Sequence, residues 1–362
     1  MNLSVINIIL IIGLGLLLGQ VNNKIHRNLY IMFMMLIFLL EASLRHPSVG
    51  MDTNNYIMFF EYVQEKSWSE LWDEFFNRYF GYNETEEDLG YTLFAKLLSS
   101  ITSDWNLFEF LRDTVFFIPF GIYLKKYADN FYHLLFAMVF YVALLHSIPM
   151  NGGRQLLALG FGILSFLALQ EKKYWKSVVW ILLGALFHQS CLLCFLILGC
   201  SLFAPQALKR VHVVSLILFP MIWMNVNRII VFMGESIGSE KFAHYGMGLA
   251  HGQTVTFILL LELLSFFCLF AIKNQQLHEN HSLKVFYSTI IGTTLFGPLI
   301  WANGAMIRTT MYFFVYMTLL VPYAIDSMFI KKDRNTVYIL VITILGGLYL
   351  SGSKANYYFF WQ

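Results

Sequence analysis

Charged residues are scarce in this sequence. Lys, Arg, Asp and Glu make up 13% of the 362 residues, whereas hydrophobic residues make up 58% and aromatic residues 17%. A soluble domain is about a quarter charged, because water must solvate its surface. The shortage therefore excludes a soluble globular protein and indicates an integral membrane protein. No nucleic-acid partner is expected.

Cysteine is also rare, and all four cysteines fall in apolar segments (Cys191, Cys194, Cys200 and Cys268). The first two have C-x-x-C spacing but no second ligand pair, so we expect buried apolar side chains, with neither a disulfide nor zinc. No metal site and no cofactor is predicted. The first apolar block lacks a basic n-region and a small-x-small cleavage site, so we interpret it as a permanent span.

Long apolar blocks predict an all-α protein, a polytopic transmembrane helix bundle with about 12 spans. The predicted spans are residues 3–21, 29–44, 106–124, 131–149, 153–170, 175–188, 190–206, 211–233, 253–272, 285–303, 305–326 and 336–350. The sixth and seventh are short and are either two spans, one long span or a re-entrant pair. Because no repeat, low-complexity tract or Pro-rich linker divides the chain, residues 1–362 are predicted to form one membrane domain.

The loops predict an orientation. Most Lys and Arg residues lie in short loops on one predicted side, which the positive-inside rule places in the cytoplasm. Both termini and the long loop 45–104 are then outside the cell. This loop carries eleven acidic and four basic residues.

The loop 45–104 contains two aromatic or aliphatic stripes at helical spacing. Ser67 and Glu70 form a capping box before the first stripe (Trp68, Leu71, Trp72, Phe75, Phe76, Tyr79 and Phe80), and a second stripe follows (Phe94, Leu97, Leu98 and Ile101). Such faces are typical of interfacial helices in the headgroup layer, and equally of helices that pack against the protein's own spans.

Three arginines lie at span ends on the predicted outer face. Arg45 closes the second span, Arg154 opens the fifth and Arg308 opens the eleventh. A single interfacial arginine usually reaches toward lipid headgroups. Three on a surface poor in cations also fit a diphosphate site, because the guanidinium matches a phosphate and stays charged. Its ligand would be a lipid diphosphate that enters sideways from the membrane.

Other polar segments lie at the same side. Residues 45–56 follow a span and are dense in turn-forming residues, and residues 151–155 begin another span with Asn-Gly-Gly-Arg-Gln. His188 lies at the tip of the short pair, where it either acts as a general base or satisfies a broken helix end. Glu86, Glu87 and Asp88 either supply a carboxylate or belong to a solvated acidic loop.

Four motifs resemble the EpsG family of Wzy-like polysaccharide polymerases. They are an R-x4-G-x-D-x3-Y segment, an N-x-x-R-Q segment, an H-x-S segment and an R-x3-Y segment; the matching residues are Arg45, Gly50, Asp52, Tyr56, Asn151, Arg154, Gln155, His188, Ser190, Arg308 and Tyr312. The resemblance covers most of the chain. It implies a glycosyltransferase of the bacterial plasma (inner) membrane that polymerises undecaprenyl-diphosphate-linked oligosaccharide at the outer face, for capsule, O-antigen or exopolysaccharide. It also implies a chain-length regulator and a flippase as partners, beside membrane lipids.

Such a reaction needs cations for two lipid diphosphates and a base for the acceptor hydroxyl. The hypothesis is that Arg154 and Arg308 bind the donor diphosphate. Arg45 holds the second lipid or supports Asp52, and His188 or Asp52 is the base. The remaining motif side chains orient or bind substrate (Gln155, Tyr312 and Tyr56).

Three other functions remain open at this stage. A flippase or transporter of the same lipid-linked sugar would carry similar cations, although it would more often show internal repeats and midplane charge. A metal-dependent glycosyltransferase would use the acidic residues 84–88, which lack a tight Asp-x-Asp pair. A structural or assembly partner would need no catalytic residues.

Overall fold

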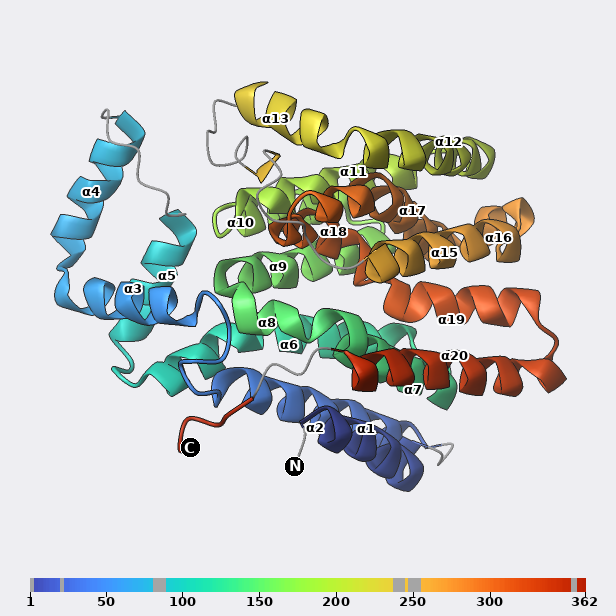
Figure 1. The fold of residues 1–362 in the computed structure, drawn as a ribbon, viewed down its shortest axis with the longest axis horizontal. Coiled ribbons are helices and arrows are strands. Elements are labelled where there is room, and N and C mark those ends of the chain that lie inside the picture. Colours follow the sequence, from blue (N-terminus) through green and yellow to red (C-terminus); the bar gives the residue numbers. More distant parts are fainter. Residues whose placement is uncertain (1–2, 20–22, 81–88, 237–244, 247–254, 353–356) are drawn as a thin grey trace. The chain divides into compact units, whose positions relative to one another are not determined.

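The computed structural model describes residues 3–19, 23–80, 89–236, 245–246, 255–352 and 357–362 (Figure 1). Every regular element in these ranges is a helix, as the sequence predicts. The chain divides into two compact units. The first comprises Met1–Ser165, Val178–Leu192 and Ile342–Gln362, and the second comprises Phe166–Ser177 and Leu193–Val341. The prediction of one domain stays a prediction.

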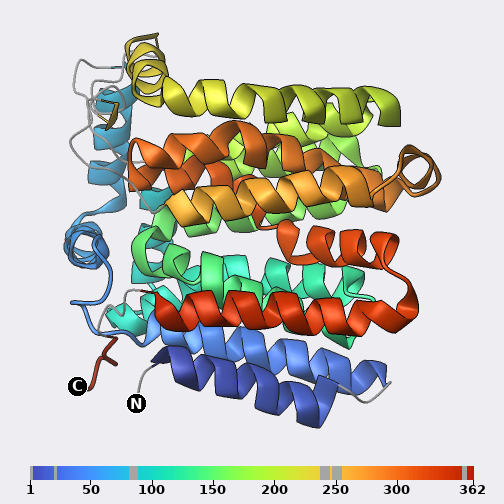
Figure 2. The same cartoon turned by 45° about the vertical axis from the view of Figure 1, so that its right-hand side comes forward.

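The first unit contains long apolar helices and the helices of the loop 45–104. They are α1 (Leu3–Leu14), α2 (Lys24–Ser43), α3 (Thr53–Glu65), α4 (Trp68–Phe80), α5 (Leu89–Ser99), α6 (Trp105–Tyr127), α7 (Phe131–Phe140) and α8 (Ser147–Asn151), with the first part of α9 (Gly153–Gln170) and most of α10 (Tyr174–Ala185). Helix α2 packs along α6. Helices α1 and α2 lie side by side in both views (Figures 1 and 2).

Asparagine and aspartate caps fix where the main helices of this unit begin. The side-chain oxygens of Asn23, Asp104 and Asn130 accept backbone N–H groups in the first turns of α2, α6 and α7, at 2.9, 2.8 and 3.1 Å. Each cap satisfies a donor that has no partner within the helix.

Helices α3, α4 and α5 fold onto the membrane helices of the first unit through one apolar core. Its members are Phe60, Val63, Leu71, Tyr91, Ala95, Leu98, Phe108 and Leu157, which come from α3, α4, α5, α6 and α9. The rings of Phe60 and Phe108 stack at 4.1 Å between centroids. The Lys96 ammonium of α5 donates to three carbonyl oxygens at the end of α3, those of Val63, Gln64 and Lys66. The loop 45–104 is therefore a folded part of its unit.

Some apolar side chains of α4 are buried in the protein and others are exposed. Leu71 is buried in the core just described, whereas Trp68, Trp72 and Phe76 are 43%, 43% and 55% exposed. The predicted capping box is confirmed: the Ser67 N–H donates to the Glu70 carboxylate at 2.7 Å, and the Glu70 N–H donates to Ser67 Oγ at 3.2 Å. Packing against the protein's own helices therefore applies to the Leu71 side of the stripe, and the position in the headgroup layer stays a prediction.

The second unit is built around α17. Its helices are α11 (Cys194–Leu202), α12 (Pro205–Met224), α13 (Val226–Ser236), α15 (Val255–Ala271), α16 (Asn274–Glu279), α17 (His281–Phe296), α18 (Ile307–Phe314) and α19 (Met317–Met328), with half of α20 (Lys331–Ser351). A buried polar network joins α12, α15 and α17: His212 contacts Tyr287 at 2.6 Å and Ser265 at 2.9 Å.

Six helices in the described ranges are long and apolar enough to cross a membrane. They are Lys24–Ser43, Phe131–Asn151, Gly153–Gln170, Pro205–Met224, His281–Trp301 and Lys331–Ser351. A seventh candidate is the pair Gly304–Phe314 and Met317–Met328, which is bent by 52°. The segments Leu3–Leu18, Gln189–Leu202 and Val255–Ala271 are shorter apolar helices. This confirms a membrane protein with several spans, and the count of twelve stays a prediction.

Several predicted spans have different bounds. The predicted span 211–233 is interrupted, because α12 ends at Met224, where the Asn225 side chain bonds the Met221 carbonyl and α13 begins at Val226. The predicted short pair does break near His188: α10 ends at Ala185, and a short 3₁₀ helix, Gln189–Leu193, precedes α11. All four cysteines are buried, as predicted.

The capping box gives α4 a defined response to acid. The pKa of Glu70 is lowered, first by the hydrogen bond from the Ser67 backbone N–H and then by the one with its hydroxyl. Because the folded pKa lies below the unfolded one, the stabilisation is present above the unfolded pKa and is lost as pH falls through the folded value. We expect the hydrogen-exchange protection of the first turn of α4 to fall below about pH 4.

Glu70→Ala should give the same loss of protection at neutral pH. The control is Glu61→Ala, which changes an exposed acid of α3. Equal protection in the Glu70→Ala and Glu61→Ala proteins would contradict this interpretation.

Candidate functional site

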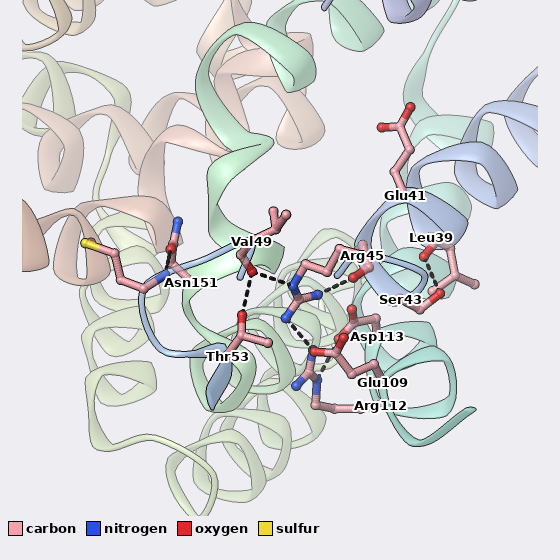
Figure 3. Close-up of polar contacts among 12 residues, drawn as sticks. Leu39, Glu41, Ser43, Arg45, Val49, Thr53, Glu109, Arg112, Asp113 and Asn151 are labelled. Atoms are coloured by element: carbon pink, nitrogen blue, oxygen red, sulfur yellow. Dashed lines mark hydrogen bonds and ion pairs between the residues drawn. The ribbon is translucent and has the colours of Figure 1, made fainter. Parts of the chain in front are cut away.

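The segment after α2 is held by a buried arginine. Arg45 is 1% exposed and donates to the carbonyl oxygens of Ala42 and Val49 and, at 2.5 Å, to the Glu109 carboxylate of α6 (Figure 3). The Val49 carbonyl also accepts the Thr53 hydroxyl at 2.6 Å, at the start of α3. Arg45 therefore fixes the turn that carries Asp52.

Gly50 brings this turn against the end of α8. Its φ of +95° lies in the region that favours glycine, and a Cβ there would be 2.1 Å from the Met150 carbonyl oxygen. The neighbouring Met51 N–H donates to the Asn151 side-chain oxygen at 2.8 Å (Figure 3). The structure thus joins two of the motifs, the segment 45–56 and the segment 151–155.

The third motif meets the second through a histidine. His188 Nε2 lies 3.1 Å from the Gln155 amide nitrogen, and His188 Nδ1 lies 2.5 Å from Ser190 Oγ. Either neutral tautomer completes both contacts, since the Gln155 amide nitrogen and oxygen can be exchanged. The backbone of the same turn is fixed from α5, because the Gly90 N–H donates to the Leu186 carbonyl at 2.8 Å. His188 is therefore held in one orientation from both ring nitrogens.

The motif residues of the first unit differ in exposure. Asp52, Tyr56, Arg154 and His188 are partly exposed, whereas Gln155 is 4% exposed. The accessible members offer a carboxylate, a guanidinium and an imidazole at the ends of helices, which are the groups needed for anion binding and proton transfer.

A buried tyrosine of α5 lies among these groups. The Tyr91 ring packs edge-on against Tyr56, with 5.8 Å between centroids. Burial raises the pKa of Tyr91, and the positive charges of Arg112 and Arg154 act in the opposite direction. Tyr91 is thus kept as a neutral phenol.

Sequence reasoning missed the charged residues of α6. Glu109, Arg112 and Asp113 are each 0% exposed. Arg112 donates to Asp113 at 2.7 Å and to Glu109 at 3.0 Å, through the same Glu109 oxygen that binds Arg45 (Figure 3). The predicted span 106–124 carries three charged residues among five consecutive positions, and burying such charges in a membrane is costly. This cost is the signal from which the sequence could have identified Glu109, Arg112 and Asp113 as functional residues.

The fourth motif lies in the second unit and is described by itself. Arg308 is partly exposed in the first turn of α18, and Tyr312, one turn later, is fully buried. Their predicted roles in substrate binding stay predictions. The acidic residues 84–88 lie outside the described residues, and among those described no three His, Cys, Asp or Glu side chains gather where they could hold a metal ion.

One comparison with known proteins gives a match. The EpsG family model matches residues 28–362, which is nearly the whole chain and includes all four motifs. This family is related to Wzy-like polysaccharide polymerases. No curated protein and no solved structure matches the chain.

The close approach at Gly50 predicts a sensitive position. Gly50→Ala should destabilise the turn by about 1–3 kcal/mol, because alanine is strained at this φ and its Cβ meets a backbone carbonyl. We expect a lower thermal unfolding midpoint in detergent and faster proteolysis within residues 45–53. Gly13→Ala is the matched control, since a Cβ at Gly13 meets nothing within 4 Å. Equal midpoints for the two variants would refute the proposed packing.

Proposed function

Because the chain belongs to the EpsG family, we propose that it polymerises undecaprenyl-diphosphate-linked oligosaccharide repeat units at the outer face of the bacterial plasma membrane. The product is a surface polysaccharide. The observation that carries this proposal is the meeting of three motifs in the first unit, where Asn151 binds the turn 45–53 and Gln155 contacts His188. Arg154, which is partly exposed, directly precedes Gln155, and Gln155 contacts a histidine that is held in a fixed orientation.

The proposed reaction is the transfer of a growing chain to a new repeat unit. The acceptor hydroxyl oxygen forms a bond to the anomeric carbon of the donor. The bond between that carbon and the diphosphate oxygen breaks, and its electron pair leaves with undecaprenyl diphosphate. The hydroxyl proton passes to a base. No nucleotide sugar is needed, because the diphosphate is the leaving group.

Each step has a candidate residue. Arg154 binds the donor diphosphate and stabilises the charge that grows on it. Arg308, in the second unit, keeps its predicted role as a diphosphate ligand. His188 or Asp52 accepts the acceptor proton. Gln155 orients His188 rather than touching the sugar, because it is buried and contacts the imidazole. Tyr56 borders the substrate, and Tyr312 keeps its predicted role of orienting sugar or phosphate.

Of the two roles predicted for Arg45, we propose support of Asp52 and not binding of a second lipid. Its guanidinium is buried and is occupied by Glu109 and two carbonyl groups, so it supports the turn of Asp52 instead of holding a second lipid. Arg45→Lys would keep the charge but lose the planar set of donors.

The proposed topology has about twelve crossings, with both termini and residues 45–104 outside the cytoplasm. In this arrangement α4 lies in the headgroup layer with Trp68, Trp72 and Phe76 toward lipid. Its other apolar side is already covered, since Leu71 is buried in the protein. A flippase and a chain-length regulator would act before and after this enzyme.

Loss of the arginine should stop polymer growth. In a deletion strain that expresses Arg154→Ala, we expect polymer to fall on the order of a hundredfold or more, because one charge-stabilising donor is removed. The measurement is the polysaccharide ladder on a gel, with single repeat units still displayed outside. Arg210→Ala, at an exposed arginine of α12, is the control and should restore the ladder.

The location of the single units tests the function itself. Units that accumulate on the cytoplasmic side in the deletion strain would identify a flippase. A full ladder from well-expressed Arg154→Ala would remove this arginine from the mechanism. Loss of activity on treatment with a chelator would favour the metal-dependent glycosyltransferase.

The position of α4 is tested by spin labels on its two faces. A nitroxide at Trp72→Cys should be more accessible to oxygen than to a polar nickel complex, because oxygen concentrates in lipid. A label at Asp73→Cys, one residue away on the polar face, should show the reverse. The native cysteines are buried and give little background labelling. Equal accessibility of the two labels would place α4 in water.

A further inference from the structure

A buried cluster of four charged side chains includes Arg45, which holds the turn of Asp52. One oxygen of Glu109 accepts Arg45 at 2.5 Å and Arg112 at 3.0 Å, and Asp113 accepts the Arg112 Nε at 2.7 Å. The four side chains are at most 1% exposed. Two carboxylates and two guanidinium groups leave no net charge. The cluster is therefore unsuited to bind a diphosphate, and its effect must be on the parts of the chain that it touches.

Arg112 touches the parts that carry the proposed chemistry. Its Nη1 atom faces the first residue of α9, since a Cβ on Gly153 would lie 2.7 Å from this atom. The next two residues are Arg154 and Gln155. On another side, the guanidinium carbon lies 5.9 Å from the centre of the Tyr56 ring. Through Glu109 it is joined to Arg45, which holds the turn of Asp52.

We infer that Glu109, Arg112 and Asp113 are positioning residues, which set the start of α9 against the segment 45–56. This inference rests on the proposed function, because it concerns the geometry of the same site. Burying four charges brings a large desolvation penalty, and apolar residues of the same volume often stabilise a protein equally well. The bonds of a charged cluster are directional, however, and fix relative positions that an apolar contact leaves variable.

A charge-balanced pair of substitutions separates positioning from stability. Arg112→Met alone leaves an uncompensated buried carboxylate and should lower the unfolding midpoint strongly. Arg112→Met with Asp113→Asn removes one charge of each sign and leaves the Arg45–Glu109 pair in place. We expect this double variant to regain most of the unfolding midpoint in detergent. It should still give at least about tenfold less polymer per molecule of membrane protein in the deletion strain.

The decisive result is the polymer yield of the double variant. A yield within twofold of wild type would show that the cluster acts only on stability, and it would overturn the inference. Failure of the proposed function is a separate outcome, because single repeat units would then accumulate on the cytoplasmic side in the deletion strain.

A second variant changes the contact between Arg112 and α9 at its other partner, Gly153. Gly153→Ala puts a methyl group against the Arg112 guanidinium, whereas Gly13→Ala, which meets nothing within 4 Å, is its control. Alanine favours the helix, so α9 itself should not be weakened. We expect a drop in polymer yield for Gly153→Ala only. Equal yields for the two alanine variants would contradict a positioning role of Arg112.

Discussion

The sharing of one carboxylate oxygen between two arginines is the interaction on which the first unit depends. Glu109 lies on α6. Its partners are Arg45, which follows the end of α2, and Arg112, which lies one turn further along α6. Since all three groups are removed from solvent, each requires the other two to offset its desolvation. The turn of Asp52 and the start of α9 can therefore be held without the large apolar side chains that would block a polar site.

The surrounding packing explains how a polar site can be built at the end of a membrane unit. Helices α3, α4 and α5 form one apolar core with α6 and α9, so the segment that follows the turn is not left as a loose loop. Two backbone N–H groups then connect the remaining parts: Met51 donates to the Asn151 side-chain oxygen, and Gly90 donates to the Leu186 carbonyl. Residues that are far apart in the sequence become neighbours through these bonds, and the first of them requires the asparagine side chain.

Composition and short motifs predicted the class of the protein but not its internal ionic contacts. The membrane class, the helical fold, the capping box of α4 and the break near His188 follow from local patterns, since each depends on neighbouring residues. The burial of Arg45 does not, because its partner Glu109 lies 64 positions away. The end of α12 at Asn225 was missed for another reason. Apolar residues continue on both sides, and the break lies at Asn225, where the backbone leaves the helical conformation.

The contact made by Lys96 has a mechanical consequence. Its ammonium binds three carbonyl groups at the end of α3 from a position on α5, so the two helices are tied together at the point where the chain turns into α4. Swinging α4 away on its linker would strain or break these bonds together. The assembly of α3, α4 and α5 should thus move as a single rigid body, so any displacement of this part of the chain must arise before α3 or after α5 and not from a hinge within it.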